Sequence, residues 1–316
     1  AVKKRAELQE SAVVPLSGGR DSRHIVLELV RIGRPPVACY TVDCTEWKSK
    51  ESEVASMVAR QAGILHVIVP GSWPSVQNEI KTALLINFSS YCHSWQLDLV
   101  DALAGSSEPL YDGIAGDVLS ESRSLTAQRH ALFESGRLAE LADELLSAGN
   151  PAFLADWFRS PDSYEAAREL LIEELKLHAN APNPVGSFFF WNRTRRGIAP
   201  SLCGVLNQGR TVYAPYLDSA LRDYLAALPA AFLLNGRLHT DVIARAYPEY
   251  AGVPYFKLEV QPLAAGPRRT FAADLLKLLL GGHGSGLIET SCVIPRLLAA
   301  MTLPSYSGAD WFYKEI

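Results

Sequence analysis

The sequence has few cysteines, and they are scattered. None of Cys39, Cys44, Cys92, Cys203 and Cys292 belongs to a Cys-x-x-Cys pair or stands at zinc-ligand spacing from a histidine. This pattern disfavours both a structural zinc site and a disulfide framework. We therefore expect a reduced, cytoplasmic protein.

Long apolar runs and an excess of charge of one sign are also missing. No apolar run reaches the length of a membrane span, and no signal-peptide segment follows the charged first residues. Lysine and arginine total 30 against 34 aspartates and glutamates, a formal net charge of −4. Such a balance gives no global basic field for nucleic acid. Neither a membrane nor a nucleic acid is expected as a partner.

The first part of the sequence alternates strand and helix patterns. Buried strands are predicted at Ala12–Leu16, Val37–Val42, Leu65–Val69 and Pro109–Tyr111, and a helix is predicted over Glu51–Ala62. Repeated strand–helix–strand units of this length indicate an α/β fold with a doubly wound parallel sheet. We expect about five strands.

The second part of the sequence changes to helix after helix. Helical apolar spacing is found over Leu138–Leu146, Tyr164–His178, Ala220–Leu228 and Phe271–Leu280. We expect an α/β core over residues 1–125, followed by a mostly helical region over residues 126–316.

The most informative motif is Ser17-Gly18-Gly19-Arg20-Asp21-Ser22, which separates the first predicted strand from a helix. Two glycines let the backbone approach a ligand, and the N–H groups at a helix start favour an anion. An acid here would repel phosphate unless it holds a Mg²⁺ that the phosphates also ligate. The motif predicts a nucleoside triphosphate site, rather than an ordinary turn whose polar residue caps the helix.

A second acidic loop, Asp112–Asp117, also follows a predicted strand. Ligands of doubly wound sheets bind at the carboxyl ends of strands where the strand order reverses. If the first and fourth strands are neighbours there, Asp21 and Asp117 would face one triphosphate and hold its Mg²⁺. A simple Gly-Asp turn is the alternative reading of this loop.

Together, the two loops resemble those of the synthetase domain of the asparagine synthase family, a group of Rossmann-like PP-loop ATP pyrophosphatases. That family carries an S-G-G-x-D-S loop and later an S-G-x-G-[SA]-D-E loop. Arg210–Asp218 resembles the family's R-x-P-[FY]-L-D string, and Tyr255-Phe256-Lys257 stands where the family has a lysine on the pyrophosphate. These matches occur in the family's order between Val13 and Glu259.

The resemblance implies ATP and Mg²⁺ as cofactors and assigns a role to each matched residue. The pyrophosphate portion of ATP would be bound by Ser17, Gly18, Gly19 and Ser22. The adenosine would be lined by backbone groups of Leu16, Val42 and Gly113. The Mg²⁺ would be bound by Asp21 and Asp117, and Lys257 would neutralise charge on the departing pyrophosphate.

The amine side of the site departs from the family. Asparagine-forming members carry a glutamate, and β-lactam-forming relatives a tyrosine, where this chain has Ile114, which cannot move a proton. The usual aromatic-Gly-Gly is replaced by Leu119–Ser122, and no glutaminase domain precedes the loops. We hypothesise that Glu121, Asp112 or Glu259 replaces the missing proton-handling group, although each fits a solvated carboxylate equally well.

The expected function is that of an ATP-dependent ligase, forming AMP and pyrophosphate, that adenylates a carboxylate for amide, lactam or macrolactam formation. Its partners would be a small-molecule or peptide carboxylate, an amine nucleophile and, compatibly, a glutaminase or pathway protein on a separate chain. The alternative is a nucleotide-binding regulatory or structural relative without turnover. Transfer-RNA modification is disfavoured by the scattered cysteines and the charge.

Overall fold

Five short parallel strands form one sheet in the order β3-β2-β1-β4-β5. The computed structural model describes residues 1–43, 50–72, 75–89, 93–121, 124–147, 154–256, 265–283 and 286–303. Val13 of the first strand pairs with Ala38 on one side and Leu110 on the other, so the strand order reverses at this strand. The strands are β1 (Val13–Pro15), β2 (Ala38–Asp43), β3 (His66–Pro70), β4 (Leu110–Tyr111) and β5 (Val212–Tyr213).

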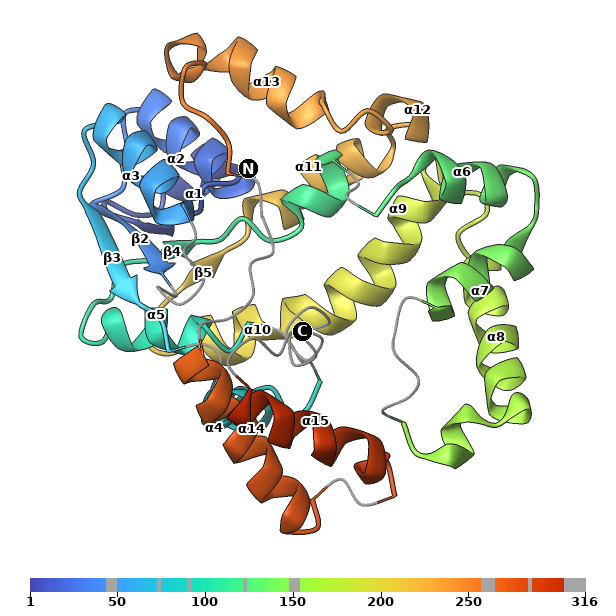
Figure 1. Ribbon diagram of the computed structural model, residues 1–316. Coiled ribbons are helices and arrows are strands. Elements are labelled where there is room, and N and C mark those ends of the chain that lie inside the picture. Colours follow the sequence, from blue (N-terminus) through green and yellow to red (C-terminus); the bar gives the residue numbers. More distant parts are fainter. Residues whose placement is uncertain are drawn as a thin grey trace.

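The helices of the first part lie around this sheet except for α4, which lies beside the C-terminal helices (Figure 1). They are α1 (Val2–Ala6), α2 (Asp21–Arg31), α3 (Glu51–Gln61), α4 (Val76–Leu85), α5 (Gln96–Ala102) and the π-helical η2 (Asp117–Glu121).

Neighbouring residues of β1 bury opposite faces of the sheet, as the two-residue period of a strand requires. Val14 packs in a cluster with Ile25 of α2 and Val58 of α3. Val13 instead packs with Leu99 of α5 and Leu206 of a later helix. Both faces are therefore covered, as is usual for a parallel sheet.

The second part is mostly helical. One of its two 16-residue helices, α8, begins with Ser160 accepting a hydrogen bond from the Ser163 amide and with Pro161 in its first turn, two common start signals. The remaining elements are α6 (Ala127–Glu134), α7 (Leu138–Ser147), η4 (Asp156–Arg159), α8 (Pro161–Lys176), α9 (Pro184–Phe189), η5 (Phe190–Ile198), α10 (Ala199–Ser201), η6 (Leu202–Leu206), η7 (Pro215–Leu217), α11 (Ser219–Ala226), α12 (Ala230–Leu233), α13 (Leu238–Ala246), η8 (Pro248–Tyr250), α14 (Ala265–Leu280) and α15 (Thr290–Thr302).

These helices form two further apolar clusters apart from the sheet. Leu141, Leu175 and Phe188 join α7, α8 and α9, while Phe271 and Leu297 join α14 to α15. In Figure 1, α7 and α8 lie near the α9 end of the helical run that leads to α10, and α14 and α15 lie near its α10 end. Within the described ranges, no helix is both long and apolar enough to cross a membrane.

The predicted fold class is confirmed: a five-stranded parallel sheet is followed by a mostly helical region. The strand neighbours required for the predicted site are also present, since β1 pairs with β4. One strand of the sheet, β5, comes from the second part of the chain, and its Val212 pairs with Leu110 of β4. The division at residue 125 stays a prediction.

Candidate functional site

The loop after β1 folds back on itself through its two serines. The Ser17 amide donates to the Ser22 hydroxyl at 2.9 Å, and the two hydroxyl oxygens are 3.0 Å apart. The Gly19 amide donates to the Ser17 hydroxyl at 3.2 Å. The residue that precedes α2, Arg20, makes no side-chain cap. The helix start therefore lacks the capping hydrogen bond expected of an ordinary strand-to-helix turn.

Gly18 is required where two other segments approach the loop. A Cβ atom at this position would lie 2.4 Å from Cβ of Phe256 and 3.3 Å from the Glu51 carbonyl oxygen. The Phe256 amide donates to the Gly18 carbonyl at 2.9 Å. Burial raises the pKa of Glu51, although the Gly18 amide donates to this carboxylate. The loop is thus bracketed by α3 and by the segment that ends at Phe256.

The second loop packs directly against Asp21. A Cβ atom at Gly116 would lie 2.3 Å from Cγ of Asp21, and one at Gly113 would lie 3.1 Å from the Ser22 amide nitrogen. Between these glycines, Ala115 has a φ of 69°, a left-handed conformation that is uncommon for a residue with a side chain. Close approach of the two loops therefore depends on the small residues that the sequence places here.

One cavity of about 290 Å³ lies between these loops, α5 and the helical run around η5. His93, which lines it, has a φ of 73°, and such strain often gathers at functional sites. Thr194 also lines it, is 2% exposed, and has a hydroxyl without a hydrogen-bond partner among the described residues. The lining residues are Pro15, Ser17, Asp21, Ser22, His93, Trp95, Gln96, Asp112, Gly113, Ile114, Ala115, Asp117, Arg193, Thr194, Ile198, Ser201 and Leu202.

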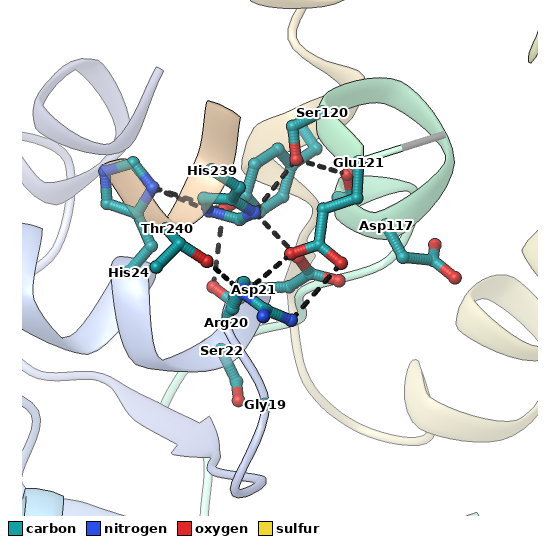
Figure 2. Close-up of polar contacts among 12 residues, drawn as sticks. Gly19, Arg20, Asp21, Ser22, His24, Asp117, Ser120, Glu121, His239 and Thr240 are labelled. Carbon is teal, nitrogen blue, oxygen red and sulfur yellow. Dashed lines mark hydrogen bonds and ion pairs between the residues drawn. The ribbon is translucent and has the colours of Figure 1, made fainter. Parts of the chain in front are cut away.

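A buried polar network holds the carboxylate of Asp21 (Figure 2). His239 of α13, 2% exposed, places its Nδ1 3.2 Å from Oδ1 of Asp21 and 2.9 Å from the Ser120 hydroxyl. Its Nε2 lies 3.0 Å from both the Tyr216 hydroxyl and Nδ1 of His24. The loop, η2, η7 and α13 therefore meet at one imidazole.

The hydrogen bonds assign the proton of His239 to Nδ1. Ser120 donates its own proton to the Gly116 carbonyl at 2.6 Å, so its oxygen can accept from Nδ1. Burial lowers the pKa of His239 to about 4, so the ring is neutral near pH 7. Nε2 is then the acceptor for the hydroxyl of Tyr216.

Arg20 and Glu121 form an ion pair beside this network (Figure 2). Nε of Arg20 lies 2.9 Å from Oε1 of Glu121 and 2.6 Å from the Thr240 hydroxyl. Burial raises the pKa of Glu121, and the neighbouring Arg20 guanidinium opposes this effect. In the same view, the carboxylate of Asp117 points away from this cluster. Asp117 is therefore oriented separately from the carboxylates of Asp21 and Glu121.

Asp112 is a perturbed carboxyl group in the cavity wall. Burial raises its pKa to about 6, although its Oδ1 accepts a 2.8 Å hydrogen bond from the Ile114 amide. The charge of Asp21 acts in the same direction as burial. Of the three carboxylates proposed to replace the missing proton-handling group, Asp112 lines the cavity, Glu121 pairs with Arg20, and Glu259 lies outside the described residues.

The structure brings five predicted site residues to the cavity: Ser17, Asp21, Ser22, Gly113 and Asp117. The other described ones lie beside it. Leu16 is 1% exposed, and its amide donates to the Tyr40 carbonyl. Val42 pairs with Val69 near the end of β2. Gly18 and Gly19 form the turn itself, and Lys257 lies outside the described residues.

Sequence reasoning missed several residues of the site. His93 of the first part and Arg193 and Thr194 of the helical part line the cavity, and His239 contacts Asp21. A single histidine in an amphipathic helix gives no sequence signal of its own, because its neighbours are set by packing. Tyr216 was found as part of a family string, but its hydrogen bond to His239 was not foreseen.

A glycine-rich loop and an acidic loop at the switch point of a parallel sheet define an α/β protein of the doubly wound class. Residues 1–83 match the family model described as asparagine synthase, which thus covers about a quarter of the chain. The matched segment contains the first loop and strands β1 to β3. A search of curated proteins finds no significant match.

Proposed function

We propose that this protein is an ATP-dependent ligase that adenylates a carboxylate and joins it to an amine. A carboxylate oxygen attacks the α-phosphorus of ATP, and the bond from that phosphorus to the bridging oxygen breaks to release pyrophosphate. The amine then attacks the acyl carbon, loses a proton and displaces AMP. The family match over residues 1–83 supports the nucleotide chemistry.

The observation that carries this proposal is the convergence of both acidic loops on one cavity. Asp21 and Asp117, from loops 96 residues apart, line the same space together with Ser17 and Ser22. Carboxylate oxygens are preferred ligands of Mg²⁺, which usually also binds substrate phosphates. The unpartnered Thr194 hydroxyl and the close glycine cradle are further features that a polar ligand would fit. When bound, Mg²⁺ would neutralise phosphate charge during the transfer.

The chain's own residues would bind and orient the nucleotide. We propose that the uncapped start of α2 and the serines of its loop hold phosphate oxygens. We propose that His239 helps to orient Asp21, since its buried Nδ1 lies 3.2 Å from Oδ1 of this carboxylate and limits its rotation. Lys257 would contact the departing pyrophosphate. The preceding residue, Phe256, supports this role because it is hydrogen-bonded to the loop.

Asp112 is the best placed candidate for accepting the proton of the amine. It lines the cavity, and burial raises its pKa to about 6, near the value that favours a general base at neutral pH. Ile114 lies on the same wall and cannot perform this role. In a variant series, Asp112→Asn should slow amide formation more than adenylate formation, whereas Glu121→Gln should spare both steps more than Asp112→Asn does.

One observation favours a second function, a nucleotide-binding relative without turnover. Ile114 occupies the cavity wall at the position where the family has its proton-handling residue. In that case, Mg·ATP would bind and remain intact with every carboxylate tested. The carboxylates of Asp21 and Asp117 argue for the ligase. They would repel a triphosphate unless a metal ion bound to both offsets the repulsion.

The test is exchange of labelled pyrophosphate into ATP, with Mg²⁺ and a panel of amino acids, peptides and small carboxylic acids. The ligase should show exchange that depends on one carboxylate and disappears in Asp21→Ala and Asp117→Ala. Gly252→Ala is a matched control, because a Cβ atom at Gly252 would meet nothing within 4 Å. Tight Mg·ATP binding without exchange across the panel would favour the relative without turnover.

A further inference from the structure

A second cavity, of about 340 Å³, adjoins the first one beyond Asp117. It is lined by Asp117, Val118, Ser124, Arg129, Phe189 and Arg193. Asp117 and Arg193 line both cavities, so they form the wall that the two spaces share. A group placed beside Arg193 can therefore reach the cavity in which the phosphates are proposed to lie.

The two arginines of the second cavity differ in what they are already bound to. The guanidinium of Arg129 donates to Glu144 at 2.9 Å and to the Ser124 carbonyl at 2.9 Å, and it lies over the Phe189 ring. Arg193 has no hydrogen-bond or ion-pair partner within the described part of the chain. Its charge contributes, after burial, to lowering the pKa of His93 to about 4. The guanidinium of Arg129 is thus already paired and forms part of the cavity wall, whereas Arg193 is a cation available to a ligand.

The backbone that carries Arg193 is itself unusual. It belongs to η5, a π-helical stretch of nine residues, and such stretches are rare and often lie at functional sites. The adjacent Thr194 is the buried residue of the first cavity whose hydroxyl lacks a partner. This segment therefore presents an unpaired cation and an unpaired hydroxyl at the junction of the two cavities.

We propose that Arg193 binds the carboxylate that is to be adenylated and that the rest of this acid occupies the second cavity. The proposal rests on the proposed ligase function and names the carboxylate subsite. A guanidinium matches a carboxylate through two parallel hydrogen bonds and thereby fixes its orientation. Held at the shared wall, one carboxylate oxygen would face the α-phosphorus beside Asp117, and the acyl chain would extend towards Phe189.

The first experiment compares Arg193→Gln and Arg193→Lys with the wild type in pyrophosphate exchange. Arg195→Gln is the matched control, because Arg195 is exposed on the same helix and its guanidinium lies over the Trp191 ring, 5.2 Å from its centroid, outside both cavities. Arg193→Gln should raise the half-saturating carboxylate concentration by roughly 10- to 100-fold and change that of ATP less than about twofold. Lysine should restore part of the loss.

Two results of this experiment would overturn the proposal. An equal rise in the half-saturating ATP concentration would mean that Arg193 binds the nucleotide phosphates instead. An unchanged carboxylate dependence would mean that it binds neither ligand.

A second experiment measures carboxylate binding without turnover. It can therefore test the carboxylate subsite independently of the proposed ligase function. Phenylglyoxal labels arginines, and mass spectrometry reports the labelling of Arg193 and Arg195 separately. Succinate and glutamate should protect Arg193 but not Arg195, and dimethyl succinate should protect neither. If the wild type shows no exchange but succinate protects Arg193, the ligase function fails and the carboxylate subsite stands. Equal labelling with and without the acids, or protection by Mg·ATP alone, would refute the subsite.

Discussion

At the scale of single residues, the site is defined by how closely its two loops approach. Gly116 lies against the carboxylate of Asp21, and Nδ1 of His239 lies 3.2 Å from Oδ1 of the same carboxylate. If Asp21 binds the metal as proposed, these two contacts would hold it in one orientation and lower the reorganisation needed during catalysis. Substitutions next to Asp21 should therefore affect the site as well.

Gly116→Ala should disable the site while leaving most of the protein folded. The added Cβ atom would lie 2.3 Å from Cγ of Asp21, so one of the two groups must move. A misplacement of about 1 Å can cost roughly 100-fold in rate, and overpacking costs about 1–3 kcal/mol of the free energy of unfolding. Exchange kinetics and urea unfolding measure the two effects. Activity like that of Gly252→Ala would show that Asp21 does not need this geometry.

Asp112→Asn should stabilise the ligand-free protein at neutral pH. Because folding raises the pKa of Asp112 from 3.8 to about 6, the folded state binds its proton more tightly than the unfolded state. Ionising the buried Asp112 carboxyl group therefore destabilises the folded protein. This destabilisation is absent below pH 3.8, grows between pH 3.8 and 6, and is complete above pH 6, where it reaches up to about 3 kcal/mol.

The variant removes this destabilisation and keeps an oxygen for the Ile114 amide. Urea unfolding in Mg²⁺-free buffer should therefore show a gain in stability above pH 6 that fades as the pH approaches 3.8. A gain that is independent of pH would contradict the assigned pKa. Greater stability combined with slower amide formation would mark Asp112 as a functional residue.

At the scale of elements, α2 links the loop after β1 to the segment that precedes Lys257. Arg23 of this helix is 1% exposed and donates to the carbonyls of Val253 and Pro254 at 3.0 and 2.5 Å. Its guanidinium also lies over the Tyr255 ring. One buried side chain thus fixes a segment more than 200 residues away in the sequence.

Arg23→Leu should release this segment. The buried carbonyl of Val253 and the partly buried carbonyl of Pro254 would lose their donor, which we expect to cost about 2–4 kcal/mol of the free energy of unfolding. The half-saturating ATP concentration should also rise if Lys257 acts on the pyrophosphate. Arg31→Leu, on the same helix with a 58% exposed side chain, should cost less than about 1 kcal/mol. Equal losses of stability from the two substitutions in urea unfolding would contradict the proposal that Arg23 holds this segment in place.

The sequence allowed the sheet and the loops to be predicted because both are local patterns. The apolar run before Ser17 and the glycines within the loop identify a strand, a turn and a helix without reference to distant residues. The predicted site required the first and fourth strands to be neighbours, and they are, as the β1–β4 pair. By contrast, His239 and Arg193 reach the site through helix packing, which periodicity alone cannot orient. Lys257 stays a prediction.

At the scale of the whole molecule, the two parts of the chain share the sheet. Val212 of β5 pairs with Leu110, and Leu202 and Leu206 of η6 cover the face formed by Val13 and Leu110. The helical part therefore supplies an edge strand and part of the core of the α/β part. Through Arg193 of η5, the helical part also forms part of the wall of both cavities.

A fragment of residues 1–125 should accordingly fail to fold cooperatively. It would leave Leu99, Leu103 and Leu110, each at most 1% exposed in the full chain, without the apolar cover of η6. We expect a loosely packed or aggregating species with weak near-ultraviolet circular dichroism and binding of a hydrophobic dye. A sharp, cooperative urea transition of the fragment would instead show that the first part is an autonomous domain.

The most direct test of the central claim follows oxygen from the carboxylate to AMP. The reaction is run with an ¹⁸O-labelled acid identified by pyrophosphate exchange, an amine acceptor and Mg·ATP, and the nucleotide is examined by mass spectrometry. If the carboxylate attacks the α-phosphorus, each AMP released on amide formation carries one ¹⁸O atom, and Asp21→Ala yields none. Label in inorganic phosphate with ADP as the product, or unlabelled AMP, would contradict adenylation.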